Sequence, residues 1–154
     1  MAHITVRVYG ILINENKQLL VSDELIRGGY YTKFPGGGLE FGEGTRACLK
    51  REFIEELDLE VEVLDHLYTT DFFQESAFRP GDQILSIYYL VKPLADIKVR
   101  LSTLTFDFDE AQILRYEEKQ EVETFRFIDW QDVSEESVTL PIDKVVVKLL
   151  KEKY

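Results

Sequence analysis

Three glutamates lie close together in a stretch of chain that has the composition of a helix. Glu52, Glu55 and Glu56 are separated by three and four residues within Thr45 to Leu57, a run without glycine or proline. In an α-helix these spacings place side chains on one face. A divalent cation such as Mg²⁺ or Mn²⁺ offsets the mutual repulsion of such carboxylates, because these ions prefer oxygen ligands. The alternative is that the three glutamates only form a solvent-exposed helix face, since glutamate-rich faces are common.

A glycine-rich segment precedes the acidic stretch. Gly36, Gly37 and Gly38 follow Pro35, and Gly42 lies shortly before the expected helix. Glycine adopts positive φ angles and lets the backbone approach a ligand closely. A loop of this kind that leads into a helix N-terminus is suited to hold a phosphate group. A tight turn from strand to helix explains the same glycines without a ligand.

Together the two features resemble the Nudix box, written G-x5-E-x7-R-E-U-x-E-E-x-G-U with U an apolar residue. The matching positions run from Gly37 to Leu59 and include Glu43, Arg51-Glu52-Phe53 and Glu55-Glu56. Pro35 to Glu40 is also similar to the usual lead-in of that box. One position departs from the pattern, because Asp58 stands where the family has glycine. That residue ends the helix, so we expect Asp58 in the left-handed backbone conformation, at a cost on the order of 1 kcal/mol.

The resemblance implies a hydrolase that cleaves the diphosphate linkage in a nucleoside diphosphate joined to another moiety. The implied ligands of Mg²⁺ or Mn²⁺ are Glu52, Glu55, Glu56 and a backbone carbonyl near Gly37. Arg51 and Glu43 are implied to pair and to fix the helix against the loop, and Gly36 to Gly38 to contact the substrate. Metal ions at such a site neutralise diphosphate charge and lower the pKa of a bound water molecule.

The general base is expected either among the helix carboxylates or in a later loop. Glu121 lies in Gln120 to Ile128, a segment similar to the part of the family that precedes a late strand and often holds a glutamate. A surface glutamate beside a strand is an equally good interpretation of Glu121. Aromatic residues such as Tyr88 and Tyr89 are more typical of core packing than of substrate contact.

Two other functions are compatible with the same resemblance. One is a module that binds nucleotides without turning them over, which the loss of box acids would indicate, and here none is lost. The other is an enzyme such as an isomerase of isopentenyl diphosphate. For the hydrolase, ADP-ribose, nucleotide sugars, oxidised nucleoside triphosphates and dinucleoside polyphosphates all stay open as substrates. Family members frequently form homodimers, so a homodimer is also expected.

Composition excludes several classes of protein. With 154 residues, 45% of them hydrophobic, the chain has the size and core of one domain, residues 1–154. A formal net charge of -11 argues against nucleic acid or an anionic membrane as partner. Cys48 is the only cysteine, so it has no disulfide partner within the chain. No apolar run is long enough to span a membrane, and the first residues do not resemble a signal peptide, so we expect a cytoplasmic protein.

The elements that position the box follow from the periodicity of apolar residues. The expected helices are Thr45 to Leu57 and Pro141 to Lys153, the latter with an apolar stripe of Ile142, Val145, Val146, Leu149 and Leu150. The expected strands are 4–13, 18–21, 30–34, 83–91 and 122–128, with 59–73 as a long strand or hairpin arm. Residues 97–101 are expected as a further strand, and 109–119 as a short helix or a loop. We therefore predict the α/β class with a mixed sheet, arranged as a Nudix-like α/β/α sandwich with the catalytic loop and helix between strands and a C-terminal helix.

Overall fold

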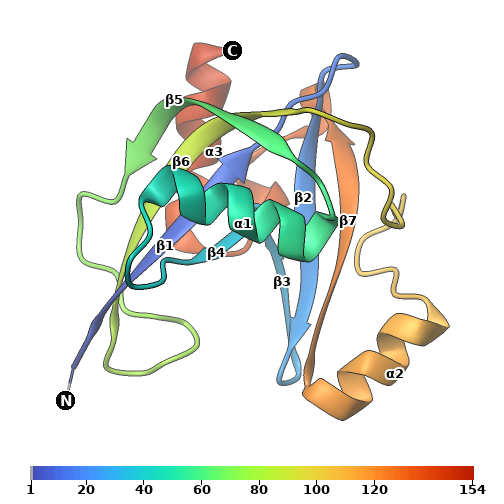
Figure 1. Cartoon of the computed structure of the whole chain (residues 1–154), viewed down its shortest axis with the longest axis horizontal. Helices are drawn as coiled ribbons and strands as arrows, with labels where there is room; N and C mark the ends of the chain where they lie inside the picture. Colours follow the sequence, from blue (N-terminus) through green and yellow to red (C-terminus); the bar gives the residue numbers. More distant parts are fainter. Residues whose placement is uncertain (1) are drawn as a thin grey trace. The chain divides into compact units, whose positions relative to one another are not determined.

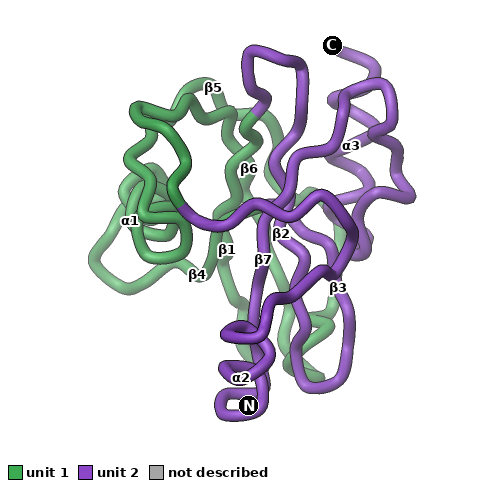
Figure 2. Tube along the Cα trace, turned by 90° about the vertical axis from the view of Figure 1, so that its right-hand side faces the viewer, with its two compact units in different colours: residues 1–12, 35–98 green, residues 13–34, 99–154 purple. Residues whose placement is uncertain are grey.

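The computed structural model describes residues 2–154, which form two compact units (Figure 2). The first unit contains the chain up to Leu12 together with Pro35–Lys98, and the second contains Ile13–Phe34 together with Val99–Tyr154. Each unit is therefore built from two stretches that are separate in the sequence. All residues of the Nudix box belong to the first unit, whereas Glu121 belongs to the second.

The first unit is built on a four-stranded mixed sheet with the order β4-β1-β6-β5. Its strands are β1 (Ile4–Ile11), β4 (Gly36–Gly38), β5 (Val61–Thr69) and β6 (Gln83–Pro93). Strand β1 runs parallel to β6 along its whole length and antiparallel to β4, where Val8 is opposite Gly37. The glycine-rich segment is thus an edge strand of this sheet, held in register by the backbone of β1.

Helix α1 (Thr45–Leu57) lies against the first sheet (Figure 1) and packs there against β4, β5 and β1. Its buried residues are Cys48, Leu49, Phe53 and Leu57. The ring of Phe53 lies so close to Gly10 in β1 that a Cβ on this glycine would be 2.7 Å from the ring atom Cε1. The predicted helix is confirmed at both ends, and its apolar residues Ala47 and Ile54 are exposed.

The second unit is built on an antiparallel three-stranded sheet with the order β3-β2-β7. Its strands are β2 (Gln18–Ile26), β3 (Gly29–Lys33) and β7 (Glu121–Asp129). Helix α2 (Glu110–Lys119) begins at a capping box formed by Asp109 and Gln112, and its C-terminus leads directly into β7. Two short 3₁₀ turns, η1 (Trp130–Asp132) and η2 (Glu135–Ser137), connect β7 to the closing helix α3 (Pro141–Lys153).

The structure corrects several predicted boundaries. Strand β2 continues to Ile26 instead of ending at Val21, and it pairs with β7 along its whole length. The predicted strand at 97–101 is wrong, because only Leu101 forms an isolated bridge there, with Phe125 of β7. In α3 the helix bounds are confirmed, while Val147 is buried and Leu149 is 41% exposed, so the predicted stripe is shifted.

The predicted α/β class is confirmed by two sheets and the helices α1, α2 and α3. Tyr88 and Tyr89 of β6 are buried, as the packing interpretation requires. Within residues 2–154, the structure has no helix with the length and apolar character that crossing a membrane demands.

Candidate functional site

The two ends of α1 explain how the box helix is placed. The helix begins after Gly44, and the hydroxyl of Thr45, its first residue, hydrogen-bonds the Tyr89 hydroxyl at 2.6 Å. It ends at Asp58, whose φ of 48° and ψ of 40° are left-handed, as predicted. The N–H of Asp58 donates to the Ile54 carbonyl at 3.0 Å. Aspartate therefore ends this helix in the conformation that glycine adopts most readily.

Arg51 joins the helix to the loop that precedes it. Its Nε and Nη2 donate to the two carboxylate oxygens of Glu43, at 3.0 and 2.7 Å. Nη2 also donates to the Gly38 carbonyl at 3.1 Å, so the guanidinium holds both ends of the loop. The Arg51 hydrogen bond, helped by the Glu40 N–H, lowers the pKa of Glu43 to about 2. This bidentate pair keeps Glu43 ionised and fixes the loop to the helix.

The same guanidinium draws two of the box glutamates together. Nη1 of Arg51 donates to Glu52 at 3.0 Å and to Glu55 at 3.1 Å. The Glu52 side chain is only 12% exposed, whereas that of Glu55 is 56% exposed. Burial raises the pKa of Glu52, and the positive charge of Arg51 opposes this shift. The single positive charge of Arg51 faces the three carboxylates of Glu43, Glu52 and Glu55, so the cluster has an excess of negative charge.

Gly37 provides the space that Glu52 occupies. A Cβ built on Gly37 would lie 2.5 and 2.6 Å from the two carboxylate oxygens of Glu52, which real Cβ atoms do not tolerate. By contrast, a Cβ on Gly38 would meet only Arg7 Nη1, at 3.8 Å. Gly36 has a φ of 154°, and a Cβ there would overlap the Val8 carbonyl oxygen. The glycines thus bring the β4 backbone directly against a box carboxylate.

The donors gathered here fit a hard divalent cation in their chemistry. Carboxylate and backbone carbonyl oxygens are the ligands that Mg²⁺ and Mn²⁺ prefer, and Glu52, Glu55 and the β4 backbone supply them. Within residues 2–154, however, no three acidic, histidine or cysteine side chains are arranged around one point as metal ligands. Glu56, the third predicted ligand, is half-buried on the same helix. Arg51 Nη1 contacts the oxygens for which a cation would compete.

Glu121, the predicted base, lies in the second unit. It is the first residue of β7, it is exposed, and its register partner on β2 is Ile26. The box residues are brought together in the first unit, and Glu121 belongs to the second.

A partly buried polar cluster in the second unit was not predicted from the sequence. Lys33 Nζ pairs with Glu24 Oε1 at 3.1 Å, and Ser22 Oγ donates to Glu24 Oε2 at 2.9 Å. Glu123 is the register partner of Glu24 across β2 and β7, and burial raises its pKa. The polar residues of β2 look like loop material until the pairing with β7 is known, so the sequence carried no separate signal for them.

Comparisons with known proteins extend over nearly the whole chain. The model of the NUDIX domain matches residues 3–149. No curated protein matches the sequence. Among solved structures, the E. coli ORF135 protein is 16% identical with a TM-score of 0.69, covering 97% of this chain and 89% of its own. A MutT NUDIX hydrolase from Burkholderia pseudomallei is 15% identical, with a TM-score of 0.68 and coverage of 96% and 98%. An ADP-ribose pyrophosphatase from Streptococcus suis is 14% identical, with a TM-score of 0.59 and coverage of 97% and 92%. At these identities the likeness shows a shared fold.

Proposed function

Because this chain belongs to the Nudix family, we propose that it is a metal-dependent hydrolase that cleaves the diphosphate linkage of a nucleoside diphosphate joined to another moiety. One observation carries the proposal most directly. Arg51 holds Glu43, Glu52 and Glu55 together, and Glu52 lies against the glycine strand. All the box acids are present, whereas their loss would indicate a module that binds nucleotides without turning them over. The family model runs through both compact units, which supports a single domain over residues 1–154.

We assign Mg²⁺ or Mn²⁺ to Glu52, Glu55, Glu56 and a backbone carbonyl near Gly37. When bound there, the ions neutralise the negative charge of the diphosphate and lower the pKa of a coordinated water molecule. Without such ions an acidic cluster repels a diphosphate, so the charge of this site itself argues for a cation.

The protein groups have separate tasks in this proposal. Glu43 orients Arg51, and Arg51 orients Glu52 and Glu55 through one nitrogen. The backbone of Gly36 to Gly38 contacts the substrate, and Gly38 is the least buried of the three glycines. Glu121 removes the proton from the attacking water. The products are two phosphate-bearing fragments, because water adds to one phosphorus while the bridging oxygen leaves with the other.

The substrate is proposed as a class. Nucleoside diphosphate derivatives, including ADP-ribose, nucleotide sugars, oxidised nucleoside triphosphates and dinucleoside polyphosphates, all contain the linkage that this chemistry breaks. The net charge of -11 disfavours a nucleic acid as substrate. It is compatible with a small phosphorylated compound, because a bound divalent cation inverts the local charge of an acidic site.

The test is a release assay on a panel of these compounds, run with Mg²⁺, with Mn²⁺ and with a chelator. Glu52→Gln is expected to lower kcat/KM by more than about 100-fold, since even an outer partner of a metal site is worth 10- to 100-fold. Glu62→Gln changes an exposed glutamate of β5 in the same unit and is expected to leave turnover unchanged. Binding of a nucleotide without any release would favour the sensing module instead.

A further inference from the structure

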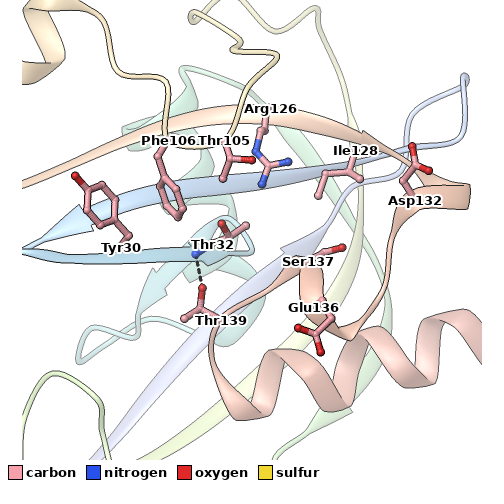
Figure 3. A pocket seen from close by; sticks show the side chains of 10 residues that line it. All are labelled: Tyr30, Thr32, Thr105, Phe106, Arg126, Ile128, Asp132, Glu136, Ser137 and Thr139. Atoms are coloured by element: carbon pink, nitrogen blue, oxygen red, sulfur yellow. Dashed lines mark hydrogen bonds between the residues drawn. The ribbon is translucent and has the colours of Figure 1, made fainter.

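A pocket of about 420 Å³ lies entirely within the second unit, on the sheet face that carries Asp23 and Arg126 (Figure 3). It contains no residue of the Nudix box and no residue used in the proposed mechanism. Volumes of this size are typical of sites for small molecules. Its lining combines an aromatic pair, an arginine and two acidic side chains, and different contacts hold each of these groups in place.

Asp23 does not line the pocket, but its carboxylate is hydrogen-bonded to three residues that do. Its fully buried carboxylate accepts hydrogen bonds from Arg126 Nε at 2.6 Å and Nη2 at 3.2 Å, and from the Thr32 hydroxyl at 2.7 Å. The N–H of Phe106 is a fourth donor, at 3.2 Å. Four donors match the capacity of one carboxylate. Asp23 therefore neutralises Arg126 and holds its guanidinium still.

The aromatic wall is formed at a cost in backbone conformation. Phe106 has a φ of 53°, which is uncommon and strained for a bulky residue. Asp23 holds this conformation through the Phe106 N–H, and the Phe106 ring meets Tyr30 edge to face, with centroids 5.0 Å apart. Tyr30 is 57% exposed despite its size. A strained backbone conformation persists only where surrounding contacts hold it, and such residues are concentrated at functional sites.

Acidic side chains line the pocket beyond the arginine. Figure 3 shows the Tyr30–Phe106 pair toward one end and Asp132 at the other, with Arg126 between them. Neither Asp132 nor Glu136 forms an ion pair with any of residues 2–154. Since Asp23 already balances Arg126, the two unpaired carboxylates give the pocket a negative charge. That charge disfavours phosphates and carboxylates and favours a cation.

We propose that this pocket binds a small organic cation with a planar ring. The ring lies against Tyr30 and Phe106, where aromatic contact and cation–π attraction both act. The charged group points toward Asp132 and Glu136. Nη1 of Arg126, which makes no hydrogen bond within the described residues, donates to an acceptor on the ring where the ligand has one.

Three probes of similar size and different charge test the proposal by calorimetry. Phenethylamine is a cation at neutral pH, phenethyl alcohol is neutral and phenylpropionate is an anion. Phenethylamine is expected to bind saturably and at least about fivefold more tightly than the alcohol, the ratio that one or two exposed ion pairs supply. Phenylpropionate is expected not to bind. Glu52→Gln is expected to leave all three results unchanged, so failure of the hydrolase proposal does not affect this test.

Matched variants identify the groups responsible. The double variant Asp132→Asn/Glu136→Gln is expected to abolish the preference for the amine over the alcohol. Glu135 is the neighbour of Glu136 in η2 and does not line the pocket. Glu135→Gln is therefore expected to preserve the preference for the amine. The proposal is overturned by equal or tighter binding of the alcohol or the anion, by the absence of binding for all three probes, or by a preference that survives in the double variant.

Discussion

The carboxylate of Glu52 fills the space beside Gly37 that any side chain at position 37 would need. We therefore predict that Gly37→Ala displaces Glu52 and lowers kcat/KM by about 100-fold, the loss that a displacement of about 1 Å causes at a reacting centre. Gly38→Ala is the comparison, because a Cβ there meets only Arg7 Nη1 at 3.8 Å. It is expected to cost much less than Gly37→Ala. Equal losses in steady-state kinetics of both variants would show that the backbone, and not Glu52, is disturbed.

The Arg51–Glu43 pair predicts how stability depends on acid. The pKa of Glu43 is lowered from 4.5 to about 2, so the pair stabilises the folded state fully above about pH 4.5. This stabilisation is lost as the pH falls through about 2. Glu43→Gln is expected to lower the melting temperature at pH 7, and the difference from the parent protein is expected to shrink toward pH 2. Glu62→Gln, an exposed glutamate without an ion pair in residues 2–154, is expected to show no such convergence in the same scans.

The box and its helix were predictable because their signals are local. Thr45 to Leu57 contains no helix breaker, and its acids, its arginine and the preceding glycines stand at fixed spacings. The left-handed Asp58 also followed from position alone, since the residue that ends a helix usually takes that conformation. What local spacing did not reveal is that Arg51 gathers Glu43, Glu52 and Glu55 around one guanidinium.

The second unit was predicted less well because its polar residues depend on distant partners. Asp23 and Glu24 made β2 look finished at Val21, yet Arg126 and Lys33 compensate their charges across the sheet. Arg126 is 103 residues from Asp23, and no periodicity reports a pairing at that distance. The strained Phe106 is likewise fixed by Asp23 and not by its own neighbours.

Divalent metal should stabilise the folded protein if the box carboxylates bind it. A ligand that binds only the folded state stabilises it by mass action, by about 2.7 kcal/mol at 100 times its Kd. The melting temperature is expected to rise on addition of Mn²⁺ or Mg²⁺, and Glu55→Gln/Glu56→Gln is expected to abolish the rise. Glu60→Gln/Glu62→Gln, two exposed glutamates just beyond the helix, is the control. A full response in the first double variant would place the metal elsewhere.

Asp58 offers a test of backbone strain that leaves the chemistry untouched. With a φ of 48°, aspartate costs more than glycine and less than alanine at this position. Asp58→Gly is expected to stabilise by up to about 1 kcal/mol, and Asp58→Ala to destabilise by a similar amount. Turnover should be unchanged in both. Denaturant unfolding measures the order, and a destabilised glycine variant would mean that the Asp58 side chain makes a contact worth more than the strain.

Glu121 is the expected base, because a metal-bound carboxylate is a poor proton acceptor. A nearby cation lowers the pKa of its ligands, so the base is expected outside the box helix. Glu121→Gln keeps the size of the side chain and removes its basicity, and it is expected to lower kcat by about 10²- to 10⁴-fold. The metal-induced rise in melting temperature should persist in this variant, which separates its role from that of Glu52.

Two neighbours of Glu121 serve as matched controls in single-turnover kinetics. Glu118 is exposed on α2, and Glu123 lies two residues further along β7, where burial raises its pKa. Glu118→Gln and Glu123→Gln are expected to retain near-normal rates of the chemical step. If Glu121→Gln retains its rate while Glu123→Gln loses it, the base is Glu123, the half-buried glutamate opposite Glu24 on the neighbouring strand. If only Glu52→Gln loses it without losing metal, the base lies within the helix itself, and the reasoning that a ligand cannot accept the proton fails for this enzyme.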